Sequence, residues 1–295
     1  MSNIEKAFDP PPDQPLDADP TDSRISQLLL DSGRLTGNDL RRIMNAQSQH
    51  ALRFADAALS LGLVNEADLD FARLQRLDCP HLRPGESRLS VELVAAYQPF
   101  AVQAEALRAL RVQLMRRWFH ERGKTLAVVS ARDNEGCSTL AANLAIVFAQ
   151  LGERTLLIDA NVRQSSQHRL FGLPQDTGLS SLLDGHGSFK EAPTKIEPFD
   201  NLFVLPAGPT PDDPQELLGR ASFAKVIEVA PFAFDVVIVD TPPVLDYADT
   251  QTIAARAGAC LLVTRRHRTR LTDVQKTKAK LQPCGAVLLG SVLTE

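Results

Sequence analysis

The chain has few cysteines and no long apolar run, and each shortage excludes a class of protein. Its four cysteines, Cys79, Cys137, Cys260 and Cys284, show neither zinc-ligand spacing nor a disulfide framework, so a reducing cytoplasm is expected. No segment approaches the ~20 apolar residues of a membrane-spanning helix, and no signal-peptide pattern is visible. Any association with a membrane is therefore expected to pass through a partner.

Composition also sets limits on partners and domain number. The net charge of −4 gives no electrostatic reason to expect nucleic acid. With 295 residues, of which 44% are hydrophobic and 23% charged, the chain suits one large and one small globular domain. Proline-rich, acidic and polar stretches mark its boundaries. We expect a disordered tail at 1–22, a helical module at 23–79, a linker at 80–96 and a nucleotide-binding domain at 97–295.

An internal repeat indicates the architecture of the small module. Gly33 and Asp39 recur 29 residues later as Gly62 and Asp68. Each glycine is placed to end a helix, and an aspartate shortly after it suits the start of the next helix. The pattern predicts two helical hairpins packed together. This module resembles the amino-terminal domain of type II secretion ATPases, which leaves two interpretations open, protein docking and nucleotide sensing.

Residues 130–144 have the spacing of a phosphate-binding loop that lacks its lysine. The pattern is G-x-x-x-x-G-K-[ST] between a buried strand, here predicted at 125–130, and a helix. Gly136 holds the last glycine position and Ser138 the magnesium-ligating hydroxyl, whereas Cys137 replaces the lysine. The candidate nucleotide-binding residues are Ala131, Arg132, Asn134, Glu135, Gly136, Cys137, Ser138 and Thr139.

Two further buried strands each end in an aspartate. The segments 154–159 and 235–240 are short apolar runs that end at Asp159 and Asp240. Carboxylates at this edge of a parallel sheet lie where open α/β sheets bind ligands. We therefore predict that Ser138, Asp159 and Asp240 organise a metal ion, and that Asp159 accepts the proton of an attacking hydroxyl. The alternative is that both aspartates only cap the segments that follow them.

The order of these segments resembles the bacterial tyrosine kinases of polysaccharide export, which are relatives of the MinD and ParA ATPases. The likeness covers roughly residues 97–294 and extends to chain-length determinant kinases of the EpsG type. It implies an α/β P-loop fold with a mostly parallel sheet flanked by helices, behind a small all-α module. It also implies ATP and Mg²⁺ as cofactors, Asp159, Arg163 and Asp240 as catalytic residues, and a membrane chain-length determinant (polysaccharide co-polymerase) as partner.

The same resemblance implies a subunit contact through Glu105, Arg108 and Arg111, and hence a homo-oligomer. These residues match the family's contact motif on the predicted helix 103–119. The alternative is ordinary ion pairing on a solvated helix face, because residues three apart on a helix are neighbours.

Several residues depart from the family pattern and leave the activity open. Besides Cys137, Asn161 stands where the family has the second acid of its A′ motif, and Thr294 stands where the family usually has an asparagine near the adenine. Tyr97 and Tyr247 are the only tyrosines. An impaired, ATP-dependent kinase regulating exopolysaccharide chain length and export is one interpretation. A pseudokinase that controls a membrane chain-length protein is the second, and a MinD- or ParA-like ATPase the third.

Two hypotheses concern the missing charge itself. Arg132 or Arg163 could partly replace it, or both could be solvated. Cys137 could fill space at the start of the helix, or its thiol could be a reactive thiolate and act as a redox switch.

Overall fold

The computed structural model describes residues 25–27, 29–30, 33–50, 52–65, 68–69, 81–83, 85 and 87–295. The chain divides into two compact units, Met1–Cys79 and Pro80–Glu295. The tail expected at 1–22 lies outside the described residues. Among the residues that are described, no helix is long and apolar enough to cross a membrane.

The first unit repeats one turn geometry at both copies of the internal repeat. Gly33 and Gly62 both adopt positive φ, 69° and 63°. Asp39 then accepts the Thr36 amide at 3.0 Å, and Asp68 accepts the Asn65 amide at 3.1 Å. Helices α2 (Gly37–His50) and α3 (Phe54–Ser60) pack over a shared apolar core. The repeated glycine and cap pattern therefore has the predicted local structure.

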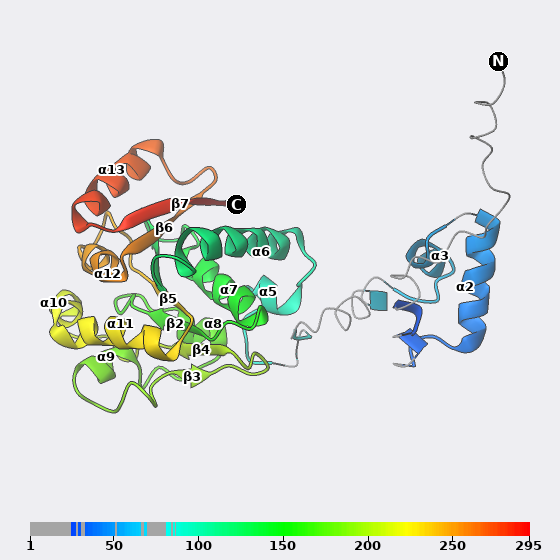
Figure 1. Ribbon diagram of the computed structural model, residues 1–295, viewed down its shortest axis with the longest axis horizontal. Helices are drawn as coiled ribbons and strands as arrows, with labels where there is room; N and C mark the ends of the chain where they lie inside the picture. The colour runs from blue at the N-terminus through cyan, green and yellow to red at the C-terminus, as the bar shows by residue number, and fades with distance from the viewer. Residues whose placement is uncertain are drawn as a thin grey trace, which may run out of the picture. The chain divides into compact units, whose positions relative to one another are not determined.

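The second unit is built on a seven-stranded sheet in the order β3-β4-β2-β5-β1-β6-β7 (Figure 1). All neighbours pair in parallel except β3 and β4. The strands are β1 (Thr125–Ser130), β2 (Thr155–Asp159), β3 (Thr194–Lys195), β4 (Leu202–Leu205), β5 (Val236–Asp240), β6 (Ala259–Arg265) and β7 (Val287–Thr294). The three runs predicted as buried strands are β1, β2 and β5.

Helices cover both faces of this sheet, because its central strands are buried on both sides. In β1, Leu126 and Val128 pack on one apolar cluster, while Ala127 and Val129 pack on the other. The first cluster contains α5 (Val94–Tyr97), α6 (Val102–Leu114), the π-helical turn η1 (Met115–Phe119), α7 (Cys137–Gln150) and α8 (Gln167–Phe171). The second contains α9 (Leu179–Leu183), α10 (Pro214–Gly219), α11 (Ala221–Ala233), α12 (Asp249–Ala257) and α13 (Leu271–Leu281), which leads into η2 (Gln282–Cys284).

The linker predicted at 80–96 is wrong at its carboxyl-terminal end. Leu93, Ala95 and Ala96 are fully buried in the same core as α7. The Ala95 amide donates to the Asn143 side chain at 2.9 Å, and the Ser90 amide donates to the Leu170 carbonyl at 2.8 Å. The polar residues before this segment suggested a linker, but the short apolar run after them docks on the sheet-covering helices.

Candidate nucleotide-binding site

The loop between β1 and α7 has the backbone of a phosphate cradle. Asn134 and Gly136 both have positive φ, 59° and 85°, and α7 begins at Cys137. Asparagine and glycine are the residues that tolerate this left-handed region best. The backbone amides at the start of α7, together with the helix dipole, provide donors for an anion.

Glu135 holds this loop together instead of facing a ligand. Its carboxylate accepts the Ala131 amide at 2.9 Å, the Arg132 amide at 3.2 Å and the Thr269 hydroxyl at 2.7 Å. The side chain is 1% exposed. Thr294 adds a further contact, since its hydroxyl donates to the Glu135 carbonyl at 3.1 Å. The loop is therefore fixed by residues from the β6–α13 connection and from the end of β7.

A cavity of about 430 Å³ lies against the loop, within the usual range for a small-molecule site. Its lining includes most of the predicted nucleotide-binding residues, namely Arg132, Asn134, Glu135, Gly136, Cys137, Ser138 and Thr139. The rest of the lining is Asn161, Gln164, Ser165, Ser166, Arg169, Leu170, Glu92, Ser130, Asp133, Thr241, Pro243 and Arg265. Ala131, Asp159, Arg163 and Asp240 are not among the lining residues; the two aspartates are fully buried.

Cys137 is a buried thiol in the position of the missing lysine. Its Sγ donates to the Val128 carbonyl at 3.2 Å. Burial, followed by the charge of nearby Asp240, raises the pKa of this thiol well above its ordinary value. A thiolate is the reactive form of cysteine, so these surroundings oppose the redox-switch hypothesis. The small side chain fills the space at the helix start.

Asp159 and Asp240 lie side by side because β2 and β5 are paired in parallel register. Both side chains are fully buried. Burial, followed by the Asp240 charge, raises the pKa of Asp159. Burial also raises the pKa of Asp240, opposed by hydrogen bonds from Gln167 and Ser138. Two adjacent buried carboxylates without a cation between them favour sharing one proton.

The two aspartates nevertheless have different partners. Asp159 accepts the amides of Asn161 at 3.1 Å, Ser166 at 3.1 Å and Gln167 at 3.0 Å, so it caps the start of α8. This is the capping alternative that the sequence left open. Asp240 accepts Gln167 Nε2 at 2.7 Å through Oδ2, and the side chains of Ser138 and Cys137 also lower its pKa. Its other oxygen, Oδ1, is buried and has no hydrogen-bond partner among the described residues.

The unpartnered oxygen of Asp240 is what a magnesium site would use. Magnesium is usually held by one or two carboxylates, with substrate phosphates and waters completing the octahedron. No group of three or more histidine, cysteine or acidic side chains converges within the described part of the chain. Asp240 beside Ser138 therefore fits a phosphate-completed magnesium ion, and does not form a closed protein cage.

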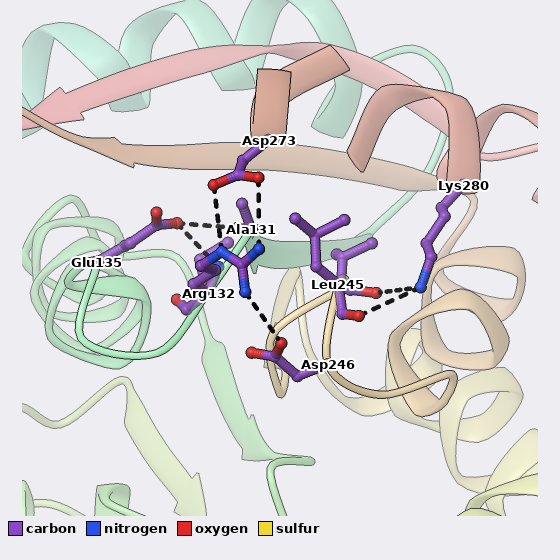
Figure 2. A network of polar contacts seen from close by, with 9 residues as sticks. Ala131, Arg132, Glu135, Leu245, Asp246, Asp273 and Lys280 are labelled. Carbon is purple, nitrogen blue, oxygen red and sulfur yellow. Dashed lines mark hydrogen bonds and ion pairs between the residues drawn. The ribbon is translucent and has the colours of Figure 1, made fainter. Parts of the chain in front are cut away.

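Both arginines predicted to replace the lysine form ion pairs with carboxylates of the chain. Figure 2 shows the Arg132 guanidinium between Asp273 and Asp246, with nitrogen–oxygen distances of 3.2 and 3.4 Å. Arg163 lies 2.6 Å from Asp249 and stacks over the Tyr247 ring at 4.6 Å from its centroid. Both guanidiniums already neutralise carboxylates of the same chain. Their pairing weighs against the compensation hypothesis, which stays a prediction.

The residues predicted for subunit contact take part in contacts within the chain. Arg108 pairs with Glu105 at 2.7 Å on α6, which is ordinary pairing three residues apart. Arg111 Nη1 donates to the Val147 carbonyl of α7 at 2.6 Å. The helix face that carries them remains a predicted contact surface.

Sequence reasoning missed Gln167, Asp273 and Arg169. Gln167 Nε2 bridges the Ser138 carbonyl at 3.0 Å and Asp240. No local motif marks these positions, because they reach the loop only after β2, β5 and β6 are paired. The only sequence signal for Gln167 was its position, as a polar residue eight residues after Asp159 at the end of β2.

Comparisons with known proteins agree with this geometry. No family model matches the chain. Tyrosine-protein kinase YwqD of Bacillus subtilis is 35% identical over 207 residues, which are 70% of this chain and 87% of that protein. The kinase domain of Escherichia coli tyrosine kinase ETK superposes with a TM-score of 0.68 at 28% identity, covering 75% of this chain and 85% of that one.

The fold is shared more widely. MinD of Pyrococcus horikoshii, solved with Mg-ADP, has a TM-score of 0.50 at 23% identity, covering 58% of this chain and 70% of that one. This likeness shows the fold alone, a P-loop sheet of the MinD and ParA type. The 35% identity to YwqD over 207 residues shows the family as well as the fold. The chain belongs to the family of bacterial tyrosine-protein kinases.

Proposed function

We propose that the chain is a Mg-ATP-binding protein-tyrosine kinase homologue with impaired catalysis, which regulates exopolysaccharide chain length and export. The observation that supports it best is the buried, unpartnered Oδ1 of Asp240 beside Ser138, behind a correctly shaped loop. A buried acceptor without a partner costs free energy. Asp240 Oδ1 accepts no hydrogen bond from the described residues, so it is suited to coordinate a cation that is bound together with a phosphate.

Each residue of the site has a distinct part in this proposal. The amides at the start of α7 would hold the phosphates, and Ser138 and Asp240 would hold the metal ion. The bound Mg²⁺ would supply charge neutralisation of the phosphates. Asp159 is the nearest base for a tyrosine hydroxyl, but it is buried and already accepts three amides. Weak phosphoryl transfer follows, because Cys137 brings no charge.

The alternative proposal is a pseudokinase that acts through its surfaces. The burial of Cys137 and the engagement of Arg132 and Arg163 favour it, because these three positions contribute no free cation to the cavity. In either form, we propose a cytoplasmic protein that reaches the inner membrane through a chain-length determinant protein. The α6 face with Glu105 and Arg108 would contact another copy. The helical module would dock a further protein.

Thermal unfolding with and without millimolar Mg-ADP tests the proposal. Ligand at about 100 times its dissociation constant adds about 2.7 kcal/mol, which raises Tm by several degrees for a unit of this size. We expect a shift for the unaltered protein, and a larger one for Cys137→Lys. A shift only in Cys137→Lys would favour the pseudokinase. No shift in either protein would refute nucleotide binding.

A further inference from the structure

Cys137 brings no charge to the loop, and the two arginines already considered are paired with aspartates. The lysine of a P-loop reaches the β- and γ-phosphates. Arg132 lies between two aspartates, and Arg163 is held by Asp249 under a tyrosine ring. Besides the paired Arg132, two further arginines line the cavity, Arg169 and Arg265.

Arg265 has a structural task that ties its charge to the loop. Its Nη1 donates to the carbonyl of Asn134, at 3.1 Å, where the backbone has positive φ. Its backbone amide is also engaged, because it donates to Thr269 Oγ1 at 2.7 Å. Arg265 therefore holds the shape of the loop, and its removal would disturb the cradle itself.

Arg169 is different, because its side chain forms no ion pair or hydrogen bond with any described residue. It is exposed, and it lines the cavity together with Ser166 and Leu170. Ser166 is the N-cap of α8, and Arg169 and Leu170 follow it by three and four residues, about one helical turn. Gln167 ties α8 to the start of α7 by its hydrogen bond to the Ser138 carbonyl at 3.0 Å.

We propose that Arg169 takes the place of the missing loop lysine and binds the terminal phosphates of the nucleotide. This inference rests on the proposed nucleotide binding and adds the residue that makes it possible. The guanidinium would approach from the α8 wall, whereas a loop lysine approaches from the start of α7. An arginine can make two parallel hydrogen bonds to a phosphate, so one side chain can serve both terminal groups.

Calorimetric titration of the full chain with Mg-ATP, Mg-ADP and AMP tests this assignment. A charge-assisted contact to phosphate corresponds to about a tenfold to a hundredfold change in affinity. Arg169→Ala should therefore weaken Mg-ATP and Mg-ADP by at least about tenfold, and leave AMP nearly unchanged. Arg169→Lys should retain most of the affinity. Arg122→Ala is the matched control, because Arg122 is exposed and precedes β1 at the opposite end of the strand.

A second pair of variants separates a phosphate contact from a fault in folding. In the Cys137→Lys background the loop has its lysine again, so Arg169→Ala should cost much less affinity than in the unaltered chain. Equal losses in both backgrounds would overturn the replacement role. If the unaltered chain binds Mg-ADP and Arg169→Ala binds it equally well, the inference fails while the proposed function stands. If the unaltered chain binds no nucleotide, both fail.

Discussion

Replacing Cys137 by lysine should change how the stability of the second unit depends on pH. In the unaltered chain, burial raises the pKa of Asp240 to about 6, and burial together with the Asp240 charge raises that of Asp159 to about 8. A carboxyl with a raised pKa stabilises the fold below its ordinary pKa, about 3.9, and that contribution is lost as pH rises through the raised value. We therefore expect the free energy of unfolding to decrease from about pH 5 to about pH 8.

The magnitude follows from the surroundings of the pair. An opposite charge within a few ångströms lowers a carboxyl pKa by about 1–3 units, or about 1.4–4 kcal/mol. Ordering the lysine side chain costs up to about 2 kcal/mol, and its own burial opposes the gain further. We expect Cys137→Lys to be more stable than the unaltered chain by about 1 kcal/mol at pH 8, and less stable at pH 5.

Fluorescence of Trp118 during urea unfolding measures the free energy of unfolding of the second unit, which contains Cys137. It is the single tryptophan, and its indole Nε1 donates to the Thr125 carbonyl at 2.8 Å in β1. Cys137→Met is the control, because methionine has a similar length without the charge. If the lysine and methionine variants share one pH dependence, the two aspartates do not share a proton and the reasoning is wrong.

Three further outcomes are expected. Arg111→Ala should lower the free energy of unfolding by about 1–3 kcal/mol, since its bond to the Val147 carbonyl is lost; Arg108→Ala, an exposed pair, should cost under about 1 kcal/mol in the same urea titration. A maleimide should label the half-exposed Cys284 before Cys137 in the native protein, and mass spectrometry showing the reverse order would contradict the burial of Cys137. Asp240→Asn should remove the dependence of ADP binding on Mg²⁺ without unfolding the chain; a calorimetric Mg²⁺ effect that survives would place the metal ion elsewhere.

Much of the fold was predictable, because its signals are local. Short runs of Val, Ile and Leu gave the buried strands, and the two turn glycines with their aspartates marked the helix ends. Asn134 suits the left-handed conformation of its loop position, which few other side chains tolerate. The packed segment 93–97 was not predicted. Its few apolar residues are buried only because they pack against α7, which lies far along the chain.

The candidate site divides in the same way. Its loop, and the two strand-ending aspartates, follow from the order of residues along the chain, because loop backbone and strand ends depend on near neighbours. The partners of these residues do not. Arg132 meets Asp273, 141 positions away, and Asp240 meets Gln167, 73 positions away. Such pairs exist only once parallel strands bring distant segments to one edge. The sequence alone thus determined where a phosphate would lie, whereas tertiary packing decided which charges remain free to meet it.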